Sequence, residues 1–202
     1  MPLPDGYIDL EPGRLAAVVT YLQQKEKPVL GVAEPPAGVV IERLAVPDLE
    51  AYRRLFRKVG EPWLWFSRLR MTDEELRAVL ADPRVEIYVL TVDGEAQGLL
   101  ELDLREPPDI EIAFLGVTPE MTGRGAGGYL MRFAIDEAWR RAPRRLWLHT
   151  CTLDHPGALG FYQRFGFRAF QRAVEISTDP RLLGLLPREA APQIPLIEPA
   201  AE

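Results

Sequence analysis

The most informative stretch of this sequence is Glu111-Ile-Ala-Phe-Leu-Gly-Val117-Thr-Pro-Glu-Met-Thr122-Gly-Arg-Gly-Ala-Gly-Gly128. An apolar strand runs into a glycine-rich loop, and the loop runs into a helix. Glycines let the backbone approach a ligand closely, and the first amides of a helix lack internal partners and carry the positive end of its dipole. The N–H groups from Gly123 to Gly127 are therefore expected to wrap an anion, most naturally a phosphate. The alternative is a glycine-rich turn without a ligand.

The glycine spacing does not fit two common nucleotide-binding folds. Gly123-x-Gly125-x-Gly127 is not followed by Gly-Lys-Ser/Thr, which disfavours the P-loop of ATP and GTP hydrolases. The loop also comes after at least four expected strands, whereas dinucleotide-binding folds carry their glycines in the first strand-to-helix turn.

A second motif follows the next expected strand and reads His155-Pro-Gly-Ala158-Leu-Gly-Phe161-Tyr162-Gln-Arg-Phe-Gly166-Phe167. A short helix here places Ala158 and Tyr162 on one face, because they are four residues apart. Gly166 is a good residue for the end of that helix, and a strand is expected to begin at Phe167.

Together the two motifs resemble the GNAT superfamily of N-acetyltransferases, over residues 39–177 and most specifically over residues 109–168. The family's loop, Gln/Arg-x-x-Gly-x-Gly/Ala, reads here Thr122-Gly-Arg-Gly125-Ala-Gly127. The family's later motif, Asn-x-x-Ala-x-x-x-Tyr with a following Gly-Phe pair, reads His155 to Tyr162 with Gly166-Phe167. Thr122 departs from the usual Gln or Arg, and His155 departs from the usual Asn.

The resemblance implies that acetyl-coenzyme A is the co-substrate and that no metal is needed. Its pyrophosphate would bind the glycine loop, and its pantetheine arm would lie between two splayed parallel strands, residues 110–117 and 146–151. The acetyl carbonyl would meet a backbone N–H near Leu115, as in an oxyanion hole. The residues implied in binding the cofactor are Leu115, Gly116, Val117, Thr122, Gly123, Arg124, Gly125, Ala126, Gly127, His155, Ala158, Phe161 and Tyr162.

Two residues are expected to carry the chemistry. Glu111 lies in a Glu-Ile-x-Phe sequence similar to that of histone-type members, and its carboxylate could take the proton that an attacking amine must lose, directly or through water. Tyr162 is the expected general acid for the departing thiolate, or it simply orients the sulfur. The alternatives are a strand-end Glu paired with a surface Arg, and a tyrosine of the core.

The acceptor pocket is expected near Glu61-Pro62-Trp63-Leu64-Trp65-Phe66, which the resemblance places over the acceptor. Trp63 and Trp65, together with Glu111, are the expected acceptor-binding residues, since large rings can frame an amine. The alternative is that both tryptophans belong to the core. Arg68 and Arg70 could meet a substrate carboxylate.

The single cysteine offers a different chemistry. Cys151 could form a thioester with help from His149 or His155, although a cysteine at a strand end is more often a small buried apolar residue. Asp154 and the two histidines make a weak set of metal ligands, and one cysteine supports neither a disulfide nor a cysteine-clustered zinc site.

Composition narrows the class of protein. The chain has 202 residues, of which 47% are hydrophobic, which is enough for one domain with a core. A net charge of −6 argues against a nucleic-acid partner. No apolar run approaches the roughly 18–20 residues that span a bilayer, so no membrane partner is expected. Met1–Asp5 do not resemble a secretory signal, and the default location is the cytoplasm.

Proline-rich ends flank a regular middle. We predict an N-terminal arm over residues 1–38 that packs on the domain, a GNAT domain over 39–177, and a proline-rich tail over 178–202. Within the arm, residues 13–24 are predicted to form a short helix with Leu15, Val18, Val19 and Leu22 on one side. The tail is predicted to form a helical turn and then extended chain. The apolar residues of both arms allow a homodimer.

The middle alternates between strands and helices. Strands are predicted over residues 39–44, 85–92, 97–104, 110–117, 146–151 and 167–176, and helices over 47–58, 72–80, from 126 to about 141, and 157–164. This order predicts an α/β fold with a mixed central sheet flanked by helices. The resemblance implies the GNAT fold, in which the sheet is splayed between the fourth and fifth strands.

The sequence therefore predicts an N-acetyltransferase that moves an acetyl group from acetyl-CoA directly to a primary amine, without an acyl-enzyme. A small amine, an amino acid and a protein amine all remain open as acceptors. The alternative function is a non-catalytic module that binds and senses acyl-CoA.

Overall fold

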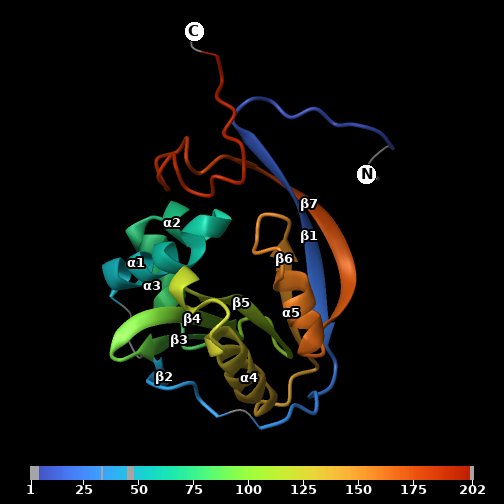
Figure 1. Cartoon of the computed structure of the whole chain (residues 1–202). Helices are drawn as coiled ribbons and strands as arrows, with labels where there is room; N and C mark the ends of the chain where they lie inside the picture. Colours follow the sequence, from blue (N-terminus) through green and yellow to red (C-terminus); the bar gives the residue numbers. More distant parts are fainter. Residues whose placement is uncertain (1–4, 33, 45–47, 201–202) are drawn as a thin grey trace.

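The computed structural model describes residues 5–32, 34–44 and 48–200 (Figure 1). It is a mixed α/β structure, as predicted; the predicted helix start at Pro47 lies outside the described residues. The strands are β1 (Arg14–Gln24), β2 (Val39–Arg43), β3 (Val85–Val92), β4 (Glu95–Asp103), β5 (Asp109–Val117), β6 (Arg145–Cys151) and β7 (Arg168–Thr178). The helices are α1 (Leu49–Gly60), η1 (Glu61–Trp63), α2 (Ser67–Arg70), α3 (Asp73–Ala81), η2 (Pro119–Met121), α4 (Ala126–Trp139) and α5 (Ala158–Arg164).

All seven strands form one open sheet in the order β2-β3-β4-β5-β6-β1-β7. Only β5 and β6 run parallel, and every other neighbouring pair is antiparallel. The parallel register holds for three pairs, from Asp109–Arg145 to Glu111–Trp147, and ends there. The two strands part toward their carboxyl ends, which agrees with the predicted splay. They are the fifth and sixth strands, and not the fourth and fifth, because residues 14–24 add the strand β1 ahead of them.

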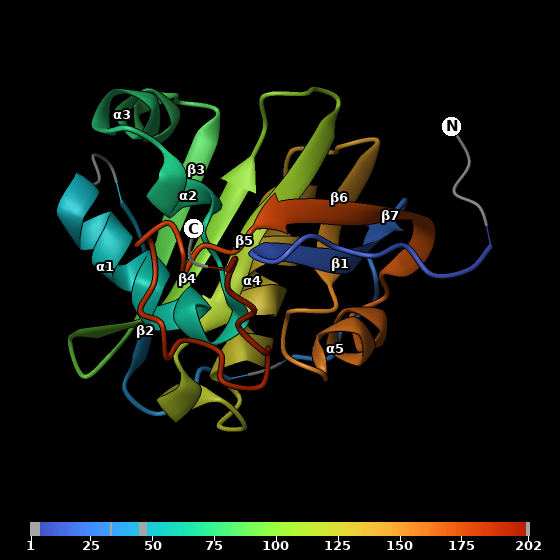
Figure 2. The ribbon, with the colours of Figure 1, turned by 90° about the horizontal axis from the view of Figure 1, so that it is seen from above.

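The sheet is covered by helices on both faces (Figure 2). Along β3 the side chains alternate, because successive residues of a strand point to opposite faces. Ile87 and Val89 pack with α1 and α3, whereas Tyr88 and Leu90 pack with α4. The central strands are thus buried on both sides, which fixes the position of β5 beside the glycine loop. Among the described residues, no helix has the length and apolarity that crossing a membrane requires.

The predicted helix over residues 13–24 is wrong, because this segment is strand β1. It is the sixth strand of the sheet, next to the edge, and pairs with β6 on one side and β7 on the other. Leu15, Ala17 and Val19 are buried, but Val18 between them is 43% exposed. A helix would have buried Val18 together with Val19. Strands β6 and β7 each offer an edge with which this segment can pair. The β-branched residues Val18 and Val19 also favour a strand over a helix.

The tail after β7 packs on its own domain but forms turns where a helical turn was predicted. Leu186, Ala190 and Ala191 are buried against the cluster that includes α1 and α3. The buried Arg181 is paired with Asp179, and its Nη1 donates to the carbonyls of Ala190 (3.0 Å) and Ile194 (2.9 Å). One guanidinium therefore holds the turns of the tail in place.

Candidate active site

Two cavities lie where β5 and β6 part. The first, of about 550 Å³, borders the glycine loop, and we call it the loop cavity. The second, of about 380 Å³, borders Glu111, and we call it the carboxylate cavity. A ligand that fills the loop cavity reaches the carboxylate cavity past residues that line both. These shared residues are Trp63, Trp65, Leu115, Asp154 and Tyr162.

Helix α4 begins beside the loop cavity, and no side chain of the described residues caps its N-terminus. Asp48 caps α1 and Thr72 caps α3, each accepting a hydrogen bond from a backbone N–H, and Glu75 completes the predicted capping box. Helix α4 instead begins after Gly125, whose φ of +84° suits glycine, with no side-chain cap among the described residues. The first N–H groups of α4 are therefore available to an anionic ligand.

Most of the predicted cofactor residues meet at this cavity. Arg124 and Ala126 do not line it, because the Ala126 side chain is buried in the core and Arg124 is exposed. The predicted residues that line it are Leu115, Gly116, Val117, Thr122, Gly123, Gly125, Gly127, His155, Ala158, Phe161 and Tyr162.

His155 serves the start of α5. Its Nδ1 accepts a hydrogen bond from the backbone N–H of Gly157 (2.9 Å), so the neutral ring carries its proton on Nε2. The ring also packs edge-on against Trp63, with centroids 5.1 Å apart. His155 can therefore offer one N–H donor to a ligand in the loop cavity.

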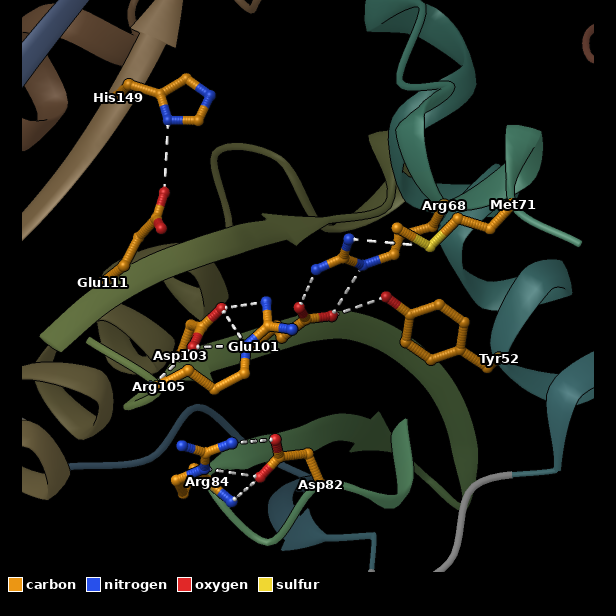
Figure 3. Close-up of polar contacts among 10 residues, drawn as sticks. All are labelled: Tyr52, Arg68, Met71, Asp82, Arg84, Glu101, Asp103, Arg105, Glu111 and His149. Carbon is orange, nitrogen blue, oxygen red and sulfur yellow. Dashed lines mark hydrogen bonds and ion pairs between the residues drawn. The ribbon is translucent and has the colours of Figure 1, made fainter. Parts of the chain in front are cut away.

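Glu111 lies where the parallel register of β5 and β6 ends, and it borders the carboxylate cavity. Its Oε1 is 3.4 Å from Nδ1 of His149, with side chains 21% and 46% exposed (Figure 3). The partner is thus a histidine, not the surface arginine of the alternative interpretation. The hydrogen bond to Glu111 raises the pKa of His149, against the opposing effect of burial.

Tyr162 lines both cavities, and none of the described residues forms a hydrogen bond with its hydroxyl. Burial raises the pKa of this phenol well above its ordinary value, and the nearby Asp154 carboxylate adds to the shift. The hydroxyl is therefore protonated at neutral pH and can donate.

Asp154 is a site residue that the sequence analysis considered only as a weak metal ligand. Its Oδ2 accepts from the Thr150 hydroxyl (2.7 Å) and the Cys151 N–H (2.8 Å), which closes the turn after β6. Its Oδ1 accepts from the indole N–H of Trp65 (3.1 Å). Asp154 thus ties the wall between the two cavities to the end of β6. An aspartate three residues beyond the strand end was the one available signal.

Trp65 satisfies both of its interpretations. It packs against Phe56 and Phe114, with ring centroids 5.6 and 5.3 Å away, and it also borders both cavities. Trp63 likewise lines both cavities. Both rings thus line the cavities, and their contact with an acceptor stays a prediction.

The structure gives no support to a cysteine nucleophile. Burial, and secondarily the charge of Asp154, raise the pKa of the Cys151 thiol to about 11, so it is not a thiolate at neutral pH. Within the part of the chain that the structure describes, no three His, Cys, Asp or Glu side chains are grouped to hold a metal ion.

Arg68 already has a partner. Its guanidinium binds the fully buried Glu101, which also accepts from the Tyr52 hydroxyl at 2.8 Å (Figure 3). Arg70 is exposed, with its guanidinium 5.6 Å from the Phe66 ring centroid, and does not line either cavity. Neither arginine is placed to meet a substrate carboxylate.

The parted parallel strands, the open helix start and the adjacent cavities agree with the class that the two motifs indicate, an acyl-CoA-dependent transferase. A family model described as "Acetyltransferase (GNAT) family" matches residues 49–167, and the chain belongs to this family. The resemblance is thereby confirmed, and the protein is an acetyl-CoA-dependent acyltransferase.

The chain is similar to several known proteins. It is 27% identical over 170 residues to an "Uncharacterized N-acetyltransferase in pepI 3'region" of Lactobacillus delbrueckii subsp. lactis, covering 76% of this chain and 98% of that one. A putative GNAT acetyltransferase of Novosphingobium aromaticivorans superposes with a TM-score of 0.56 at 20% identity, covering 83% of this chain and 67% of that one. A GNAT acetyltransferase of Elizabethkingia anophelis with acetyl-CoA bound gives 0.51 at 21% identity, covering 66% and 78%. These two structures bear on the fold alone.

Proposed function

We propose that this protein is an N-acetyltransferase that passes the acetyl group of acetyl-CoA directly to a primary amine. The observation that carries the proposal is the meeting of the loop cavity and the carboxylate cavity at Leu115 and Tyr162. One cavity offers main-chain donors for a phosphate, and the other offers a carboxylate for an amine. Nothing in the comparisons favours the non-catalytic sensor.

The residues of the loop cavity fit acetyl-CoA. The uncapped N–H groups at the start of α4 would bind the pyrophosphate, and positive φ angles at Gly123 and Gly125 shape that cradle. The residues of β5 beyond Glu111 no longer pair with β6, so their backbone groups would hold the pantetheine arm. The solved relative of Elizabethkingia anophelis, with acetyl-CoA bound, supports this fit. When bound, acetyl-CoA supplies the activated thioester.

Glu111 and Tyr162 divide the proton transfers. Glu111 takes a proton from the ammonium group of the acceptor, directly or through water, and so frees the nitrogen lone pair. The nitrogen bonds to the acetyl carbon as the carbon–sulfur bond breaks, and the Tyr162 hydroxyl gives its proton to the departing thiolate. The acylated nitrogen then gives up its second proton, which returns to the Tyr162 oxygen directly or through water and leaves a neutral amide. The Leu115 backbone N–H would stabilise the carbonyl oxygen. No acyl-enzyme forms.

Several predictions of the sequence remain part of this proposal. They are the three-part division at residues 38 and 177, a cytoplasmic location, a homodimer, and the lack of nucleic-acid and membrane partners. Trp63 and Trp65 are proposed to contact the acceptor.

The test is an assay of free thiol released from acetyl-CoA with a panel of amines, run beside calorimetry of acetyl-CoA binding. The proposal expects amine-dependent thiol release with one acetyl group on the amine by mass spectrometry. A sensor would bind acetyl-CoA and gain thermal stability without releasing thiol in the presence of any amine. That result would overturn the proposal.

A further inference from the structure

Both arginines of the carboxylate cavity are already paired with carboxylates. Among the described residues that line it, the arginines are Arg68 and Arg105. Arg68 is bonded to the buried Glu101. Arg105 clasps Asp103, with Nε 3.0 Å from Oδ1 and Nη2 2.5 Å from Oδ2 (Figure 3). A carboxylate on a substrate would find no free guanidinium here.

Several carboxylates of the same cavity have no arginine or lysine as a partner among the described residues. Asp154 accepts hydrogen bonds from Trp65, Thr150 and Cys151, which are all neutral donors. No basic side chain of the described residues lies within ion-pair distance of Asp154 or of Glu175, which also lines this cavity. Glu111 has His149 as its partner. The cavity therefore carries an excess of negative charge.

The negative charge of these carboxylates acts on His149. The pKa of His149 is raised first by its hydrogen bond to Glu111, with further contributions from the charges of Asp154 and Glu175. The charged and titratable groups that act on it thus come from β5, β7 and the turn after β6, and the Tyr21 ring of β1 lies 5.8 Å away. Three carboxylates act on one small volume.

The remaining wall of the cavity is mostly apolar and includes four aromatic rings besides Tyr162. Trp63, Trp65, Phe66 and Phe114 line it, and Arg68 already lies 5.0 Å from the Phe114 ring centroid. Aromatic faces attract cations and also bury apolar surface. The wall thus suits the body of an amine as well as its charge.

We infer that the acceptor is a cationic primary amine with an apolar or aromatic body and no carboxylate beside the amine. This inference rests on the proposed function and narrows it, because it disfavours free amino acids acetylated on their α-amine. A substrate carboxylate would meet like charges and would lose water without gaining a partner. The ammonium group, by contrast, meets Glu111 and its neighbouring carboxylates.

The test compares amines with their carboxylated counterparts, phenethylamine with phenylalanine and tryptamine with tryptophan. We expect kcat/KM to be about tenfold or more higher for the amine without the carboxylate in each pair. Equal or better rates with the amino acids would overturn the inference and leave the proposed function standing. If no amine releases thiol, the proposed function fails instead. Calorimetry of the same pairs on protein saturated with coenzyme A still ranks them, and equal or tighter binding of the amino acids overturns the inference.

A pair of variants sharpens the test. Asp103→Asn removes the charge that holds Arg105, so the preference against phenylalanine should shrink by about threefold or more. Asp82→Asn is the matched control, because Arg84 clasps Asp82 through the same two atoms, 3.0 and 2.7 Å away, outside both cavities (Figure 3). The control should leave the preference unchanged, and equal shifts in both variants would contradict the inference. Should Asp103→Asn fold poorly, Glu175→Gln on the exposed β7 must reduce the preference, or the inference fails.

Discussion

The loop cavity offers its ligand main-chain groups, whereas the carboxylate cavity offers side chains. In the first, the open start of α4 and the part of β5 that no longer pairs with β6 offer backbone donors and acceptors. In the second, Glu111, His149 and Asp154 act through their own functional groups. Main-chain groups depend on backbone conformation and tolerate changes of side chain. This difference predicts that acetyl-CoA binding survives with Thr122 and His155 in place of the usual family residues.

The largest expected effect is on the carboxylate cavity. Glu111→Gln keeps the shape of the side chain but cannot take a proton, so kcat should fall by about 10²-fold or more at neutral pH. The affinity for acetyl-CoA, measured by calorimetry, should not change, because the loop cavity is untouched. Glu42→Gln on strand β2 is the control. Turnover within about twofold of the parent would remove Glu111 from the mechanism.

Tyr162 borders both cavities, so a variant can distinguish a role in proton transfer from a role in cofactor binding. Tyr162→Phe should lower kcat by about tenfold to a hundredfold, since the thiolate then leaves without a proton donor. Acetyl-CoA affinity should stay within about threefold, because the ring still packs against Phe161 and Phe167. A loss confined to affinity would instead assign the hydroxyl to cofactor binding.

The main-chain character of the loop cavity can be tested with two glycines. Gly125 and Gly94 have nearly equal φ angles, +84° and +85°, so alanine at either costs about 1 kcal/mol of stability. Only Gly125→Ala changes the start of α4, and it should weaken acetyl-CoA binding by about tenfold. Gly94→Ala in the β3–β4 turn should lower thermal stability as much as Gly125→Ala does, but it should leave the affinity for acetyl-CoA unchanged. Equal affinities in both variants would refute a main-chain cradle.

The smallest effect concerns the titration of His149. Its pKa is raised chiefly by Glu111, so Glu111→Gln should lower that pKa toward about 6.5. Because the folded pKa lies above the unfolded one, the pair stabilises the fold below about pH 6.5 and loses this contribution as pH rises through the folded value. NMR titration is simple, since the chain has two histidines. An unchanged His149 curve would show that the two side chains do not interact.

The sequence predicted the segment from α3 to α5 well because its signals are local. The Asp93-Gly94 turn, the Thr72–Glu75 capping box and the glycine loop each act within a few residues. Strand β1 was missed because Leu15, Val18, Val19 and Leu22 fit a helical period as well as a strand. Its pairing with β6 and β7 lies far along the chain and cannot be seen locally.

The candidate site likewise has a part that local motifs predict and a part that only the tertiary structure brings together. Its cofactor residues lie in two continuous motifs, so their gathering around the loop cavity could be expected from sequence. Asp154 meets Trp65 across 89 residues, and Glu111 meets His149 only through the register of β5 with β6. Such contacts depend on tertiary structure, and nothing in the residues alone specifies them.

The position of β1 has a consequence for how the molecule assembles. This strand is synthesised before both of its neighbours, and among the described residues β1 is the one strand that pairs with β7. Long-range pairing of this kind slows folding and leaves strand edges exposed in the meantime. A nascent chain would hold β1 unpaired until β6 and β7 emerge. Fragments that begin at residue 39 would leave β7 detached from the sheet.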